Sequence, residues 1–101
     1  MKRNGSDVCS VFEGFMDYLS AMQLGIIASD WLVLNSVSNV EKALKVLDDY
    51  RRIDCYLDND DAGHRTLERL RKDFGEKVFD RSSLYADHKD LNEYLLSQKQ
   101  D

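Results

Sequence analysis

Three acidic residues follow segments of the sequence that favour β-strands. Glu13 ends the run 7–13, Asp58 directly follows the run 52–57, and Asp60 lies two residues later in a turn before a helical segment. In an open parallel sheet, ligands bind outside the carboxyl ends of the strands, so we expect these carboxylates to lie together. Carboxylate oxygens suit Mg²⁺ or Mn²⁺, which keep several waters and bind one or two protein carboxylates. The sequence therefore predicts a divalent-metal site at this edge.

The acidic segment 58–63 also has a simpler interpretation. Asp and Asn are preferred at helix starts, where their side chains cap backbone N–H groups and favour the positive end of the helix dipole. An EF-hand calcium loop is poorly supported, because its twelfth position would be Arg69 and not Glu. A Walker A phosphate loop is absent from the sequence. Helix capping and metal binding therefore remain as the two interpretations of this segment.

The first half of the chain predicts strand, helix and strand. The β-prone run 7–13 is followed by Gly14, and the next apolar residues repeat at helical spacing: Phe15, Met16, Leu19 and Met22. Gly25 is expected to end this helix in a left-handed conformation. Residues 26–34, rich in Ile, Trp, Val and Leu, then predict a second strand.

The second half continues the alternation of helices and strands. Ser38 and Glu41 have capping-box spacing at the start of a second helix, and residues 52–57 predict a third strand. A third helix is expected to end at Gly75, residues 77–80 predict a short fourth strand, and an amphipathic helix follows residues 87–89. This alternation predicts an α/β, Rossmann-like three-layer sandwich with a roughly four-stranded, mainly parallel sheet flanked by helices. We expect one domain over residues 7–96, a flexible N-terminus at 1–6 and a frayed C-terminus at 97–101.

Composition limits the possible partners and compartment. The 101 residues are 43% hydrophobic and 33% charged, as in one globular domain, and the apolar runs are too short for a membrane span. Lys2 and Arg3 are basic, but polar residues follow where a signal peptide needs an apolar stretch, so we expect a cytoplasmic protein without membrane partners. Cys9 and Cys55 lie in apolar segments without metal-binding spacing. A net charge of −5 disfavours nucleic-acid binding by bulk positive charge, unless a bound cation screens the carboxylates.

Three blocks of the sequence resemble a known family. Residues 11–17 contain Glu13-Gly14 with a further acid, Asp17; residues 55–63 contain Asp58-Asn59-Asp60 with a trailing Ala-Gly; and residues 89–95 begin with Lys89-Asp90. Their order and spacing resemble the Toprim domain of bacterial primases, type IA and type II topoisomerases, OLD-type nucleases and recombination mediators. The primase-type domain is the most similar. Two positions depart from it, since Leu91 replaces a frequent Pro and Asn92 a frequent Asp.

The resemblance implies roles for individual residues. Asp58 and Asp60 would hold Mg²⁺ or Mn²⁺, and Glu13 would join the metal shell or act as the catalytic acid or base. Asp17 and Asp90 would support the site or hold a second metal ion. Lys89 lies beside the expected site and is a candidate phosphate contact; the alternative is a solvated basic residue before a helix.

The resemblance also implies a function. We expect a Mg²⁺-dependent nucleotidyl-transfer or phosphodiester module of a DNA primase-like protein, for example from a mobile element. It would act on DNA or an RNA–DNA hybrid together with flanking domains of its parent protein, and it would be inactive alone. The alternatives are a metal-dependent nuclease, a topoisomerase-like module, or a non-catalytic binding or assembly module in DNA replication or recombination.

Overall fold

A computed structural model describes residues 7–26, 30–34 and 40–98. Strands and helices alternate along the chain as expected. The strands are β1 (Val8–Phe12), β2 (Asp30–Val33), β3 (Arg52–Tyr56) and β4 (Val78–Asp80), and the α-helices are α1 (Phe15–Leu24), α2 (Val40–Leu47), α3 (Asp61–Phe74) and α4 (Leu91–Gln98). Short 3₁₀ helices occupy Gly75–Lys77 and Ser82–Tyr85.

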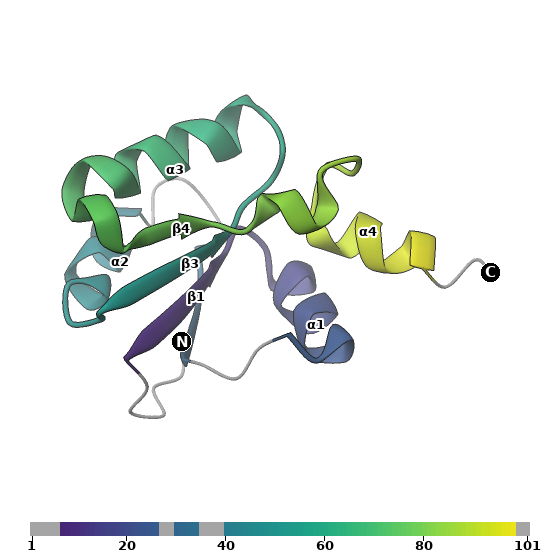
Figure 1. The fold of residues 1–101 in the computed structure, drawn as a ribbon, viewed down its shortest axis with the longest axis horizontal. Helices are drawn as coiled ribbons and strands as arrows, with labels where there is room; N and C mark the ends of the chain where they lie inside the picture. Colours follow the sequence, from purple (N-terminus) through teal and green to yellow (C-terminus); the bar gives the residue numbers. More distant parts are fainter. Residues whose placement is uncertain (1–6, 27–29, 35–39, 99–101) are drawn as a thin grey trace.

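The strands form one parallel sheet in the order β2-β1-β3-β4 (Figure 1). The central pair, β1 and β3, is aligned so that Val11 lies opposite Cys55 and Phe12 opposite Tyr56. Each parallel connection requires a crossover, and the helices supply it. The expected four-stranded, mainly parallel sheet is therefore confirmed, and all of its pairs are parallel.

Helices cover both faces of this sheet, which gives the predicted three layers (Figure 1). On one face, buried residues of β1 and β3 pack against α2 and α3 in a cluster that includes Val11, Cys55, Leu47 and Leu70. On the other face, Phe12 and Tyr56 form a second cluster with side chains of α1, α4 and the 3₁₀ helix before α4. The alternation follows from the two-residue period of a strand, which sends successive side chains to opposite faces.

The ends of helices α1 and α4 lie among the residues that the structure describes. Gly25 follows α1 with φ 71°, the left-handed conformation expected of a helix-ending glycine. Ser38, the expected cap of α2, lies outside the described residues, as do 1–6 and 99–101, so the predicted flexible N-terminus stays a prediction. Helix α4 extends through Gln98. No helix among the described residues is both long enough and apolar enough to cross a membrane.

Helix α1 is oriented differently from what its apolar repeat suggests. The side chains that repeat at helical spacing are exposed, whereas the buried residues of the helix are Asp17, Ser20 and Ala21. The polar ones face α4, where Ser20 Oγ donates to Asn92 Oδ1 at 3.1 Å and Asn92 N donates to Asp17 Oδ1 at 3.2 Å. Hydrogen bonds to α4 thus stabilise the buried polar face of α1.

Candidate metal centre

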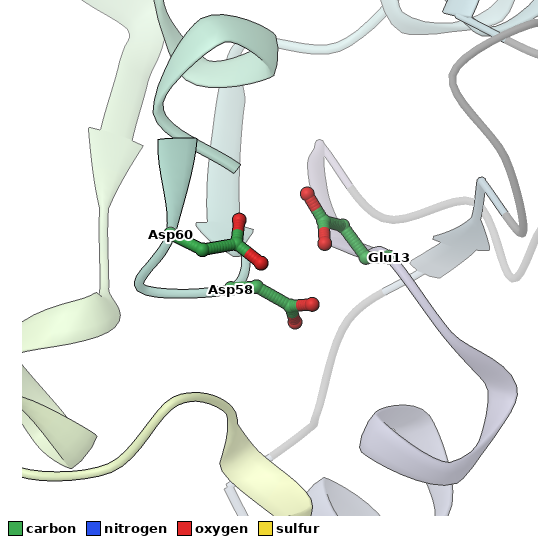
Figure 2. A group of neighbouring side chains, drawn as sticks. All are labelled: Glu13, Asp58 and Asp60. Carbon is green, nitrogen blue, oxygen red and sulfur yellow. The ribbon is translucent and has the colours of Figure 1, made fainter. Parts of the chain in front are cut away.

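The three predicted metal ligands lie at the carboxyl edge of the central strand pair. Glu13 directly follows β1, Asp58 lies two residues beyond β3, and Asp60 precedes α3. Because β1 and β3 are parallel neighbours, their ends meet at the same edge. Figure 2 shows the carboxylates of the three residues around a common space, and one oxygen from each lies within 4.8 Å of the others. The three side chains are therefore close enough to share one cation.

Asp60 caps helix α3 and also belongs to the cluster of three acids. Its Oδ1 accepts a hydrogen bond of 2.7 Å from Gly63 N, which makes it the N-cap of α3. Its Oδ2 lies 4.0 Å from Nζ of Lys89, a side chain that is mostly exposed. The cap fixes the carboxylate relative to the helix, so Asp60 is held in place before any ligand binds. Helix capping and metal binding are thus compatible at this residue.

The side chains of Glu13 and Asp58 lie close enough to shift each other's pKa. Partial burial, followed by interaction with Asp58 and then Asp60, raises the pKa of Glu13 from 4.5 to about 8. Burial raises the pKa of Asp58; the hydrogen bond from Glu13 opposes that shift, and the repulsion of Asp90 and Asp60 adds to it. With a pKa of about 8, the Glu13 carboxyl holds its proton at neutral pH when no metal is bound. A cation placed between these oxygens would relieve the repulsion.

One oxygen at this site has an unsatisfied bonding requirement. Oδ1 of Asp58 is buried and has no hydrogen-bond partner among the described residues. Burying a polar atom without a partner is costly, and a metal ion is one way to satisfy it. With three oxygen ligands within 4.8 Å of one another, this residue set fits a hard divalent cation such as Mg²⁺ or Mn²⁺.

A second group of acids adjoins the first. Oxygens of Asp17, Asp58 and Asp90 also lie within 4.8 Å of one another. Asp17 is buried, and its burial raises its pKa to about 6, while the N–H of Asn92 opposes that shift. Asn92 stands at the position where primase-type domains often have Asp. Its Oδ1 accepts a hydrogen bond from Ser20 Oγ. The structure thus brings Asp17 and Asp90 to the site, and their predicted supporting or second-metal role stays a prediction.

Asn59 organises the site in a way that the sequence analysis missed. Its side-chain Nδ2 donates to the carbonyl oxygens of Tyr85 at 3.0 Å and His88 at 2.9 Å, and its backbone N donates to Lys89 O at 2.6 Å. These bonds connect the turn after β3 to the segment that carries Lys89 and Asp90. The amide of Asn59 carries two N–H donors, one for each carbonyl oxygen, but nothing in the sequence indicates which carbonyl groups it reaches.

Replacing Asn59 with alanine is expected to lower the free energy of unfolding by about 1–2 kcal/mol. Two hydrogen bonds are lost, and each contributes about 1 kcal/mol. Urea denaturation of the wild type and Asn59→Ala measures the change. The control is Gln23→Ala, which removes an exposed amide from α1. Equal midpoints for Asn59→Ala and the control would show that Asn59 does not hold the two segments together.

The acids lie in the lining of an open cleft of about 450 Å³. Glu13, Asp17, Asp58 and Asp90 contribute carboxylates to it. The remaining lining includes apolar side chains, which the sequence analysis did not connect with the site: Phe15, Met16 and Leu34. A cleft lined by both carboxylates and apolar side chains suits a ligand that carries both kinds of group.

Comparison with known families agrees with this geometry. The sequence pattern of the Toprim-like family matches residues 10–95, which is most of the chain. The chain belongs to the Toprim-like family. The resemblance of the three sequence blocks to Toprim domains is thereby confirmed. A search of curated proteins finds no significant match.

Among solved structures, the Toprim-like chain is similar to the crystal structure of the primase fragment of the bacteriophage T7 primase-helicase protein. The TM-score is 0.76 and the sequence identity is 25% over 96% of this chain. The chain spans 42% of the length of that fragment. The α/β fold is therefore that of a primase-type Toprim domain, and its acidic clusters are compatible with divalent metal binding.

Proposed function

We propose that this Toprim-like chain is the Mg²⁺-dependent nucleotidyl-transfer module of a DNA primase-like protein that acts on nucleic acid. The observation that carries the proposal is the convergence of Glu13, Asp58 and Asp60 at one edge of a fold similar to a primase fragment. The unpartnered Oδ1 of Asp58 supports a bound cation at this edge. The similarity to less than half of the T7 fragment supports a role together with other domains that bind the template.

The residues of the site have distinct proposed roles. Asp58 and Asp60 would hold the divalent cation, and Asp17 and Asp90 would support it or hold a second one. When bound, such a cation neutralises phosphate charge and polarises the phosphoryl group. Glu13 has a pKa of about 8, so near neutral pH it can hold or release a proton at its carboxylate, as a general acid or base does. Lys89 is exposed beside Asp60 and can contact a phosphate oxygen.

Calorimetric titration with a nucleoside triphosphate tests the proposal. The wild type is expected to bind ATP or GTP with Mg²⁺ and to lose most of that affinity in EDTA, because its net charge of −5 repels free triphosphate. Asp58→Asn is expected to weaken binding at least tenfold. Glu68→Gln, which removes an exposed acid from α3, is the matched control and should bind as the wild type does. Absence of Mg²⁺-dependent binding in the wild type would contradict the proposal.

Turnover by the isolated chain is a separate expectation. We expect no robust primer synthesis and no strand cleavage, since phosphoryl transfer depends on positioning and a domain of this charge offers little to hold a template. Primer-extension and nicking assays with Mg²⁺ or Mn²⁺ measure this. Metal-dependent cleavage that Glu13→Gln abolishes would overturn the primase-like proposal in favour of a nuclease.

A further inference from the structure

The exposed apolar face of α1 begins inside the cleft. Exposed fractions on this face are 52% for Phe15, 57% for Met16 and 54% for Met22. Phe15 and Met16 line the cleft together with Glu13 and Asp58, whereas Met22, two helical turns further on, does not. The apolar face therefore has a part that belongs to the cleft and a part that does not.

From these observations we propose that Phe15, with Met16 beside it, contacts the base of a bound nucleotide. The proposal rests on the proposed function, because it places the phosphates of that nucleotide at the carboxylates and Lys89. Phe15 follows Glu13 by two residues, so their backbones are at most about 7 Å apart. One nucleotide can thus reach both Phe15 and the carboxylates of the cleft.

The side chains that line the cleft indicate how a nucleotide would be oriented: its phosphates at the carboxylates and its base at Phe15 and Met16. Phosphates are anionic and require the cation or Lys89, so they do not bind at Phe15 and Met16, whose side chains offer no donor. A nucleobase is uncharged and has two π-faces, which stack on aromatic side chains with little dependence on sequence. The thioether of Met16 is also a favourable neighbour for an aromatic ring.

The ring of Phe15 packs against another aromatic side chain. It contacts the ring of Tyr18 with centroids 5.8 Å apart, and Tyr18 is stacked on Trp31 at 3.9 Å. Trp31 and Tyr18 pack against the buried cluster on this face of the sheet. A ring that is exposed on one side and packed on the other loses little freedom when a base stacks on it.

A nucleotide fits this part of the cleft better than an apolar segment of a protein. An apolar partner covering Phe15 and Met16 would also desolvate the adjacent carboxylates of Glu13 and Asp58, which is costly without compensating charge. A nucleotide with its cation supplies that charge at the carboxylates and an apolar face at the ring.

Paired titrations separate the base from the phosphates. The affinities of the Mg²⁺ complexes of ATP and of inorganic triphosphate are measured for the wild type, Phe15→Ala, Phe15→Trp and Met22→Ala. Phe15→Ala is expected to weaken ATP about tenfold and to leave inorganic triphosphate unchanged. Phe15→Trp should retain ATP affinity, and Met22→Ala, on the same face outside the cleft, should behave as the wild type.

The outcomes distinguish this inference from the proposed function. If the wild type binds neither ligand, the proposed function fails and the base contact fails with it. If the wild type binds both ligands but Phe15→Ala weakens neither, or weakens both equally, the base contact is wrong and the metal–phosphate site stands. Thermal melts of each variant verify that it folds. Because Phe15 and Met22 are exposed, we expect their replacement to change the melting temperature little.

Discussion

Gly63→Ala is expected to lower the free energy of unfolding by about 3 kcal/mol or more. For a domain of this size, that change lowers the melting temperature by at least about 12 °C. A β-carbon at Gly63 would lie 2.0 Å from the backbone oxygen of Asp58 and 2.9 Å from its carbonyl carbon. These are backbone atoms, so the turn itself has to move. Because Gly63 N also donates to Asp60 Oδ1, that movement displaces both predicted metal ligands of the turn.

Gly14→Ala is the matched control. Gly14 belongs to the other sequence block of the site, has φ −125° and ψ 154°, and would place a β-carbon no closer than 3.6 Å to Asp17 Oδ2. Any residue adopts this extended conformation, so we expect a change below about 1 kcal/mol. Thermal and urea denaturation of both variants measure the difference. A Gly63→Ala protein that melts within two or three degrees of the wild type would contradict the described turn.

The stability of the metal-free protein is expected to fall as pH rises. The pKa of Glu13 is about 8 in the folded chain and near 4.5 when unfolded, so between these values the folded state binds more protons than the unfolded state. Stability contributed by the protonated carboxyl is therefore complete below about pH 4.5 and is lost as pH approaches 8. We expect a loss of about 2–3 kcal/mol, because the side chain is partly exposed and water screens its interactions. Asp17, with a pKa of about 6, acts in the same direction.

Glu13→Gln isolates the contribution of this one group. Urea denaturation in EDTA at a series of pH values from 5 to 8.5 compares the wild type, Glu13→Gln and the exposed-acid control Glu68→Gln. The stability advantage of Glu13→Gln over the wild type should grow with pH, whereas Glu68→Gln should follow the wild type. A constant difference between Glu13→Gln and the wild type across this range would show that the Glu13 carboxyl does not hold its proton in the folded state.

The layout of the site could be predicted from the sequence because it depends on local patterns and one topological rule. Glu13 and Asp58 follow apolar β-prone runs, and strands that alternate with helices form parallel pairs whose carboxyl ends coincide. The acidic segment before α3 indicated the position of Asp60 at the site. In the structure its side chain also caps this helix. The fold class followed from the same alternation.

The orientation of α1 and the role of Asn59 could not be predicted in this way. An apolar repeat predicts a helix, but which face is buried depends on the neighbour, and here α4 offers hydrogen bonds to the polar side of α1. Asn59 bonds to carbonyl groups 26 and 29 residues away, and no local pattern encodes such contacts. Both features depend on tertiary structure, and both affect the cleft.

We propose that Glu13, Asp58 and Asp60 bind a divalent cation in the folded state only. Binding to the native state alone adds RT ln(1 + [L]/Kd) to stability, which is on the order of 1.4 kcal/mol for about 10 mM Mg²⁺ and a Kd near 1 mM. That corresponds to a rise of about 5–10 °C in melting temperature for a domain of this size. Asp58→Asn removes a repelling charge and a ligand, so it should be more stable than the wild type without metal and insensitive to Mg²⁺.

The most direct test is a set of thermal melts of the wild type, Asp58→Asn and Glu68→Gln in Mg²⁺, Mn²⁺ and NaCl of matched ionic strength. We expect the wild type and Glu68→Gln to melt several degrees higher in either divalent salt than in NaCl, and Asp58→Asn to melt at the same temperature in all three. Equal melting temperatures of the wild type in divalent and monovalent salt would contradict a metal site in this chain.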